Sequence, residues 1–462
     1  MTVVVALVLL GLLIAIRTPI GLALGMAGTV GILLLDGAGS ASSTLAGSPA
    51  ANLVQHGLII VPLFILMGYL LMHAGLAADL FDVASKVVGR RVPGGLAIAA
   101  VLARAAFAGV TGSSAATVAS IGRISYLEMR RHGYRDSFAA GIVAMAGTLG
   151  VMIPPSAFLV VYAIIAEVSV QAMLLAGIIP GLLSALVYST LIVIRVTRPG
   201  QTLITDPGPA GSGATAGSLG AVGRARGSAS LVAPSVGSSS RVLRAVSLSA
   251  VAILFFVVIG GMYLGFFTAT EAGAVGASAA LVLTLLICAL RREKPWLAVG
   301  RALVESVSST SMIALLLAGS GIFSYFLVLA GVPRTISQIA LNAEVPGWLV
   351  VIGILVILLI LGAVLEGMSL LLIVTPLALP ILLELGFDPI WFGILLVKSI
   401  EIGLVTPPLG INVYVLAGGV RDLKAERGFA GVAPFWLAEI VSMAIVFIFP
   451  SIVLFLPQTA AG

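Results

Sequence analysis

Two short proline-containing stretches are the residues whose types and spacing most clearly predict chemistry in this sequence. Ile402 to Gly410 reads IGLVTPPLG, and Leu149 to Ala157, 253 residues earlier, reads LGVMIPPSA. A proline pair inside a helix removes two backbone donors and frees the carbonyls of the preceding turn. Inside a membrane such carbonyls are tolerated only where protein buries them or where they line a cavity. Freed carbonyls suit Na⁺, and the N-terminus of the following half-helix attracts an anionic group.

Two Na⁺ sites are therefore expected, each formed by one break and a facing cluster of small or polar residues. The first is predicted to combine Gly112, Ser113 and Ser114 with Thr148, Gly150 and the Pro154-Pro155 break. The second is predicted to combine Glu366 and Gly367 with Gly403, Thr406, the Pro407-Pro408 break and Gly410. The residues predicted to bind a solute are Ser113, Ser114, Ser156, Glu366, Gly367 and Asn412.

Structural interpretations of the same residues remain open. A single proline in a membrane helix usually makes only a kink, although two matched pairs favour a transporter. The small residues at 112–114 could instead pack one helix against another. Glu366 and Glu401 are expected at membrane depth, where an ionisable group is a functional candidate by default. They could also form structural ion pairs with Lys398, Arg104 or Arg123.

Composition places the chain among polytopic α-helical membrane proteins. Hydrophobic residues make up 60% of the 462 positions and charged residues 9%. No water-soluble domain can cover so much apolar surface with so few charges. The spans are continuously apolar, which excludes a closed β-barrel with its alternating strands. The first apolar run lacks a basic start and a cleavage site, so it is predicted to be a retained span.

Enzymatic and nucleic-acid functions find no support in the sequence. Cys288 is the only cysteine, and there is no HExxH, no Walker A motif and no Gly-x-Ser-x-Gly elbow in context. The net charge of +6 reflects basic residues that flank the spans and mark the cytoplasmic side. We expect neither an enzyme nor an organic cofactor, and any pumping must draw on an ion gradient.

The basic flanks predict a topology with both termini outside. Residues 38–55 are expected to form an outer loop, and 198–243 a flexible cytoplasmic linker rich in Gly, Ser, Ala and Pro. Residues 1–197 are predicted to hold scaffold helices, a re-entrant hairpin at 94–131 and a broken helix at 138–166. Residues 244–457 are predicted to repeat this plan, with a hairpin at 348–383, a broken helix at 390–417 and a last span at 435–456.

A shift of 253 residues superposes the two halves of the chain. It aligns both proline pairs, and it also aligns Gly150 with Gly403, Pro93 with Pro346 and several other glycines. Because the halves enter the membrane from opposite sides, we interpret them as inverted repeats.

Four runs of residues resemble a known family: AFAGVTGSSAATVASIG at 106–122, AGTLGVMIPP at 146–155, AGIIPG at 176–181 and FDPIWFGILLVKSIEIGLVTPPLGIN at 387–412. They are similar to the large membrane subunit of tripartite ATP-independent periplasmic (TRAP) transporters, the DctM-like proteins, and the similarity covers nearly the whole chain outside the linker. The resemblance implies an elevator-type permease in a bacterial inner membrane, driven by Na⁺. It also implies a separate small membrane subunit of about four helices and a periplasmic binding protein that delivers an organic anion, usually a carboxylate. The long linker departs from the simplest family pattern.

Two other functions are compatible with the same pattern of residues. One is a self-sufficient Na⁺/dicarboxylate symporter, which would transport without any binding protein. The other is a channel or a non-transporting scaffold, which would pass ions only down their gradients.

Overall fold

The computed structural model describes residues 1–16, 18–54, 56–89, 91–111, 114–198, 249, 252–335, 338, 345–363, 365–408, 410–420 and 423–461. These residues are predominantly helical and include no strand. Six of the helices are long and apolar enough to cross a membrane, or seven if a bent pair counts as one span. The prediction of an all-α polytopic membrane protein is confirmed.

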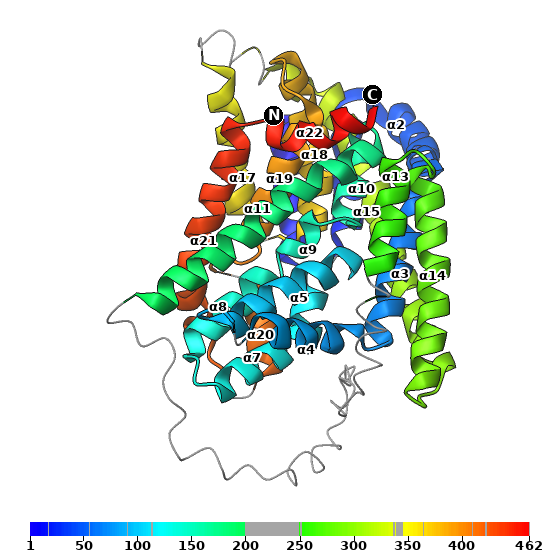
Figure 1. Ribbon diagram of the computed structural model, residues 1–462. Coiled ribbons are helices and arrows are strands. Elements are labelled where there is room, and N and C mark those ends of the chain that lie inside the picture. The colour runs from blue at the N-terminus through cyan, green and yellow to red at the C-terminus, as the bar shows by residue number, and fades with distance from the viewer. Residues whose placement is uncertain are drawn as a thin grey trace.

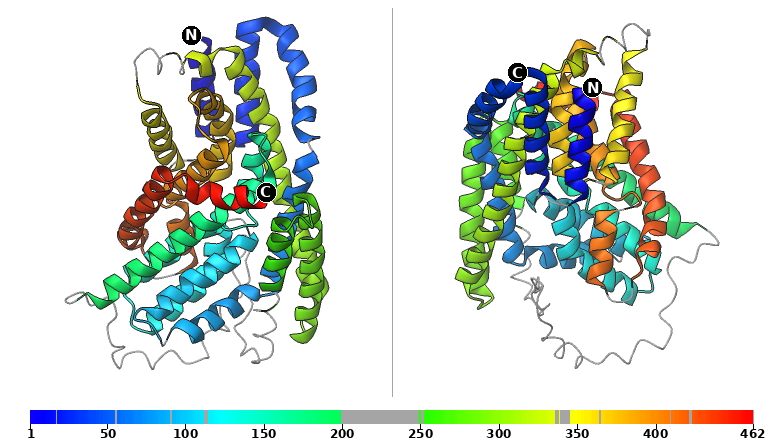
Figure 2. Two further views of the ribbon diagram at one scale, coloured as in Figure 1. Left: turned by 45° about the horizontal axis from the view of Figure 1, so that its top comes forward. Right: turned by 180° about the vertical axis from the view of Figure 1, so that it is seen from behind.

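Two long helices and the N-terminal helix form a unit with its own hydrophobic core. α1 (Thr2–Ala15), α2 (Ile20–Leu53) and α15 (Pro295–Leu329) bury apolar residues that form a cluster separate from the main core. A Cβ at Gly21 would lie 2.5 Å from the carbonyl oxygen of Leu315, and one at Gly28 would lie 2.8 Å from Cα of Phe323. Small residues of this kind let two membrane helices approach closely. Figures 1 and 2 show α2 and α15 running together along one side of the molecule.

The prediction of an outer loop at 38–55 is wrong, because α2 continues as helix to Leu53. Its direction changes at Gly37, whose φ of 86° is non-helical. Glycine accepts this conformation without the clash that a Cβ would cause. Beyond the kink the segment is rich in alanine and carries no charge, so the helix resumes and satisfies its own backbone.

The predicted hairpin at 94–131 corresponds to four consecutive short elements. α5 (Gly95–Thr111) forms the first arm. α6 (Ser114–Thr117), the π-helical segment η2 (Val118–Gly122) and α7 (Arg123–Arg131) form the second. Gly112 and Ser113, which the sequence predicted as site residues, lie outside the described residues. The hairpin follows α3 (Ile60–His73) and α4 (Leu76–Val88).

The first broken helix begins at Asp136 and is interrupted twice, where the sequence predicted a single break. It consists of α8 (Asp136–Ala146), α9 (Leu149–Met152) and α10 (Ala157–Ile165), with a bend of 44° across the second interruption. The first interruption, at Gly147 and Thr148, has no proline and was not predicted. α11 (Val170–Thr197) then packs closely along the break, because a Cβ at Gly181 would meet Ile153 at 2.7 Å.

The second half of the chain contains matching pieces. The segment 252–263 includes η5 (Phe256–Gly260) and α13 (Gly261–Tyr263). The elements that follow along the chain are α14 (Ala269–Leu290), α15, α17 (Gly347–Gly362), α18 (Gly367–Glu384), α19 (Pro389–Gly403), α20 (Ile411–Gly419), α21 (Ala425–Ile448) and α22 (Ser451–Ala461). α17 and α18 occupy the predicted hairpin at 348–383, and α19 and α20 the predicted broken helix at 390–417. The last predicted span, 435–456, instead starts earlier and ends at Ile448, and a separate helix begins at Ser451, after Pro450. The predicted linker falls almost wholly outside the described residues.

Both chain ends lie at the same end of the molecule (Figures 1 and 2). The elements α4, α5, α7, α8 and α20 gather near the opposite end (Figure 1). The division into two inverted repeats remains a prediction.

The first broken helix is held against α21 by glycine contact and by ion pairs. A Cβ at Gly431 would lie far inside contact distance of the carbonyl oxygen of Ser137, so the two backbones touch. Near this crossing, Asp136 accepts bonds from Arg427 of α21 at 2.8 Å and from Arg130 of α7 at 2.5 Å. One carboxylate therefore joins the hairpin, the broken helix and α21.

Replacing Gly431 with leucine should prevent α21 from packing on α8, because no side chain fits between the two backbones. We expect the unfolding midpoint of the purified chain to fall sharply, or the folded protein to be lost. Fluorescence-detected size exclusion and thermal unfolding would measure this. Gly300→Ala is the matched control, because a Cβ at Gly300 meets nothing within 4 Å. Equal unfolding midpoints for G431L and wild type would show that the crossing is not tight.

Candidate functional site

The carbonyls at the end of α8 are satisfied by side chains from three different elements. The carbonyl of Val143 accepts from Arg104 of α5, and that of Ala144 accepts from Nδ2 of Asn412 at 3.3 Å. The carbonyl of Met145 accepts from Oγ1 of Thr148 at 2.7 Å. Backbone groups freed by a break must find such partners when water is excluded. The turn at Gly147 and Thr148, ahead of the first proline pair, is therefore closed by polar side chains that converge on it.

Two residues predicted to bind the solute meet here, although they are almost 300 positions apart in the sequence. Ser114, at the start of α6, donates from its hydroxyl to Oδ1 of Asn412 at 3.3 Å. Both side chains are buried. The tip of the first hairpin thus contacts α20, the second half of the other broken helix, and α20 also packs against α8.

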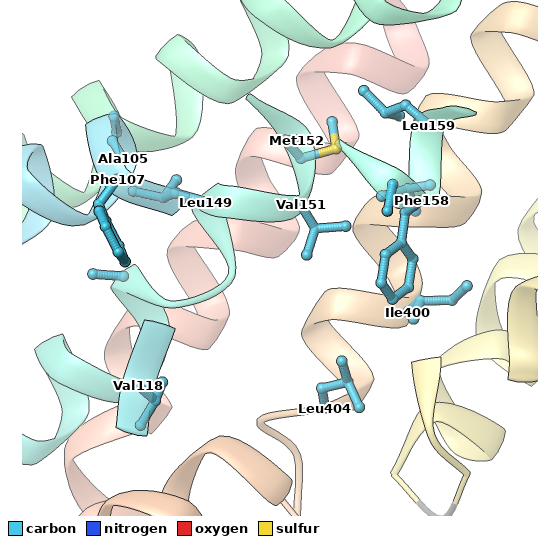
Figure 3. Packing of buried hydrophobic residues seen from close by; sticks show 14 of the residues in the cluster. Ala105, Phe107, Val118, Leu149, Val151, Met152, Phe158, Leu159, Ile400 and Leu404 are labelled. Carbon is cyan, nitrogen blue, oxygen red and sulfur yellow. The ribbon is translucent and has the colours of Figure 1, made fainter. Parts of the chain in front are cut away.

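The second hairpin has the mirror arrangement. A Cβ at Gly367 would lie 2.9 Å from Cγ2 of Ile400 in α19 and 3.1 Å from the ring of Phe158 in α10. Figure 3 shows Phe158 and Ile400 side by side, with Leu404 close below. Each hairpin therefore contacts its own broken helix and also half of the other one. The sequence pattern predicted only the contacts within each half.

Glu366 acts as the N-cap of α18. Its carboxylate accepts from the backbone N–H of Met368 at 3.1 Å, and from both the N–H and the hydroxyl of Ser369, at 3.0 and 3.1 Å. A carboxylate at this position satisfies the free N–H groups of the helix and complements its dipole. This local role accounts for most of the bonding of a half-buried side chain that the sequence predicted as a Na⁺ and solute ligand.

A threonine near each break is held by the polar group of an aromatic side chain. Thr148 lies 3.4 Å from the hydroxyl of Tyr188 in α11. Thr406 donates to the carbonyl of Ile402 at 2.6 Å and accepts from Nε1 of Trp436 in α21 at 2.9 Å. In both halves the aromatic residue comes from the helix that follows the broken one. Both threonines belong to the predicted Na⁺ sites.

The remaining predicted site residues line the two breaks. Gly150 lies in α9, and Ser156 is the N-cap of α10, with its hydroxyl accepting from the N–H of Leu159 at 3.4 Å. Gly403 ends α19 against Gly362, and Gly410, with φ of 39°, is the N-cap of α20. Pro154 and Pro155 are buried, whereas Pro407 and Pro408 are exposed. Only the second break is thus open to its surroundings.

A buried ion pair and a buried lone acid lie on α19. Lys398 pairs with Glu439 of α21 and donates to Ser184 of α11 at 2.8 Å and to Ser442 of α21 at 3.2 Å. Glu401 is 2% exposed, and neither of its oxygens has a hydrogen-bond partner in the part of the chain that the structure describes. The possible pairing of Glu401 with Lys398, left open by the sequence, is therefore not formed.

Sequence reasoning missed three residues of this site, and a signal existed for one of them. Glu439 is a single charge inside an apolar span, which marks a functional or paired group by default. Tyr188 and Trp436 carry no such signal, because aromatic residues are common throughout membrane helices. Arg104 was considered only as an ion-pair partner, whereas the structure gives it carbonyl acceptors.

The fold and the two broken helices define this molecule as a membrane transport protein. Its structure is similar to that of the YdaH transporter of Alcanivorax borkumensis, with a TM-score of 0.59 at 14% identity, covering 91% of this chain and 90% of that one. At this identity the likeness extends to the fold alone.

The chain belongs to the family described as the DctM component of tripartite ATP-independent periplasmic transporters, which it matches over residues 7–452. It is 34% identical to the C4-dicarboxylate TRAP transporter large permease protein DctM of Pseudomonas aeruginosa, covering 94% of this chain and 93% of the relative. It is 31% identical to the isethionate TRAP transporter permease protein DctMQ of Oleidesulfovibrio alaskensis, covering 96% of this chain and 64% of that relative. The resemblance stated from the motifs is confirmed.

Replacing Lys398 with methionine should destabilise the fold by about 3–5 kcal/mol, because it leaves the Glu439 carboxylate buried without its partner. The double variant Lys398→Met with Glu439→Leu should recover most of the loss, since an apolar pair of similar volume avoids the desolvation cost. Unfolding midpoints of the purified variants would measure both effects. A double variant as unstable as the single one would show that the serines, not the carboxylate, account for the effect.

Proposed function

We propose that this chain is the permease subunit of a secondary transporter that imports an organic anion, driven by a Na⁺ gradient. The observation that carries the proposal is that each hairpin contacts the broken helix of the other half of the chain. Ser114 of the first hairpin meets Asn412 beyond the second break, and Gly367 of the second hairpin meets Phe158 beyond the first. A site built this way can change its exposure when one group of helices moves against another.

The packing of α1 and α2 supports an elevator mechanism. With the C-terminal part of α15 they share a hydrophobic cluster of their own, while both hairpins, both broken helices and the rest of α15 contribute to the main core. We propose that the first group is part of a scaffold and that the hairpins and broken helices move together. The predicted orientation, with both termini periplasmic, belongs to this proposal.

Na⁺ coupling is supported by the polar groups at the two breaks. Thr148 with the carbonyls around Gly150 and Pro154 would form one Na⁺ site, together with the turn at Gly112 and Ser113. Thr406 with the exposed break at Pro407 would form the other. Glu401 adds a buried carboxyl group with no hydrogen-bond partner among the described residues, and Glu439 and Glu366 are the acidic groups nearest to act on it. A cation nearby would stabilise its ionised form.

The solute and the partners are proposed from chemistry and from the relatives. The two relatives are named for a C4-dicarboxylate and for isethionate, which are both small organic anions. The name DctMQ and the extra length of that relative support a small membrane subunit as a partner. We propose that a periplasmic binding protein delivers the anion to this chain and its small membrane subunit. Membrane lipid surrounds the assembly.

Uptake in proteoliposomes tests this function directly. The chain is reconstituted with its small subunit, and labelled succinate or isethionate is added with and without the secreted binding protein encoded beside it. We expect uptake that requires both the binding protein and an inward Na⁺ gradient. Uptake without any binding protein would instead identify a self-sufficient symporter, and flux that follows only the ion potentials would identify a channel.

Replacing Ser113 or Thr406 with alanine should weaken the dependence of uptake on Na⁺, because each change removes a proposed oxygen ligand. The apparent Na⁺ affinity, from uptake rates at varied Na⁺, is the measurement. Thr197→Ala is a matched control, since Thr197 makes a similar bond to the carbonyl four residues earlier, at 2.8 Å, but is exposed. An unchanged Na⁺ response in both site variants would reject the assigned sites.

A further inference from the structure

Arg104 is a fully buried cation without a carboxylate partner. Its relative exposure is 0%, and no ion pair within the described part of the chain includes it. Nη1 donates to the carbonyl of Val143, and Nη2 donates at 3.5 Å to that of Thr117. These bonds satisfy carbonyls but leave the charge uncompensated. An uncompensated charge in a membrane interior is costly and marks a functional group by default.

The free donors of Arg104 have the geometry that a carboxylate requires. A guanidinium carries five N–H donors in a planar fork. Nε is buried and has no partner, and Nη2 makes only the one long bond to Thr117. The Nε and Nη2 edge is the side on which arginine takes a carboxylate or sulfonate through two parallel bonds. The Nε and Nη2 donors on this edge of Arg104 could therefore bind both oxygens of one carboxylate.

The guanidinium packs directly against the backbone of a glycine. A Cβ at Gly122 would lie 2.5 Å from Nη2, so any larger residue there would displace the fork. Gly122 ends the π-helical segment of the first hairpin. The charged group and the glycine that lets it lie here therefore belong to one hairpin.

This charge lies next to the contact between Ser114 and Asn412. Thr117, which accepts from Nη2, is the last residue of the short helix that Ser114 begins. Val143, which accepts from Nη1, is adjacent to Ala144, which accepts from Asn412. The guanidinium is one helical turn from the point where the hairpin, the first broken helix and α20 meet. An anion placed between these elements would reach it.

We infer that Arg104 binds the anionic group of the transported solute through its unpartnered Nε edge, when the elements around it separate. The inference rests on the proposed function, since it requires that the solute be an organic anion. Ser114 and Asn412 bond to each other in the empty site and separate to admit the solute. The solute then supplies the negative charge that the interior lacks.

Ligand-dependent stability tests the inference on the full chain with its small subunit in nanodiscs. The probes are succinate and isethionate, with succinamide as the neutral control, all in Na⁺ buffer. We expect the unfolding midpoint of wild type to rise with an anionic probe and not with succinamide. Arg104→Gln should abolish this rise, Arg104→Lys should keep part of it, and Gly122→Ala should reduce it. Arg123→Gln, an exposed arginine of the same hairpin, should respond as wild type does.

The probe-free protein gives a second readout that does not depend on the solute. Because Arg104→Gln removes an uncompensated charge and keeps an amide donor, its unfolding midpoint should equal or exceed that of wild type. A midpoint several degrees lower would show that the guanidinium only caps the carbonyls, and would overturn the inference. The same anion response in Arg104→Gln and wild type would overturn it too. A wild type that responds to no anion would instead overturn the proposed function and this inference with it.

Discussion

The structure depends on one constraint, which is that backbone polar groups inside a membrane must be satisfied even where a helix is broken. Two spans of this chain are interrupted at proline pairs, and neither can complete its own hydrogen bonds there. At the end of α8, ahead of the first proline pair, the carbonyls of Val143, Ala144 and Met145 accept from Arg104, Asn412 and Thr148, which come from different elements. The interruption therefore gathers distant parts of the chain into one site. The need to satisfy buried backbone groups thus shapes both the fold and the site.

The same constraint explains why the two halves cross. A hairpin that packed only on its own broken helix would leave the far half of that helix, with its exposed end, facing lipid. Instead α20 lies against the first hairpin and α8, and α10 lies against α18 and α19. The half-helices α10 and α20 are thereby each packed against protein from the other half of the chain. Small residues make the approach possible, as Gly367 does beside Ile400 and Phe158.

Buried charge is distributed unevenly over this framework. The pair of Lys398 and Glu439 is compensated and further bonded to two serines, which is the condition under which a buried ion pair is tolerated. Arg104 and Glu401 have no such partner among the described residues. The ion pair, by contrast, joins α19 to α21 and has a structural role.

The sequence by itself determined the class, the helical spans, the two interruptions and the family, because continuous apolar runs and proline pairs have local physical consequences. It also brought Ser114 and Asn412 into one group of site residues. Only the tertiary structure decided which groups meet. Three contacts depend on the relative placement of helices far apart in the chain. They are the possible pairing of Glu401 with Lys398, the position of Glu366 at a break or at the end of its own helix, and the choice of carbonyls to which Arg104 donates. The helix beyond Gly37, which contains Pro49, and the additional interruption at Gly147 escaped the sequence as well.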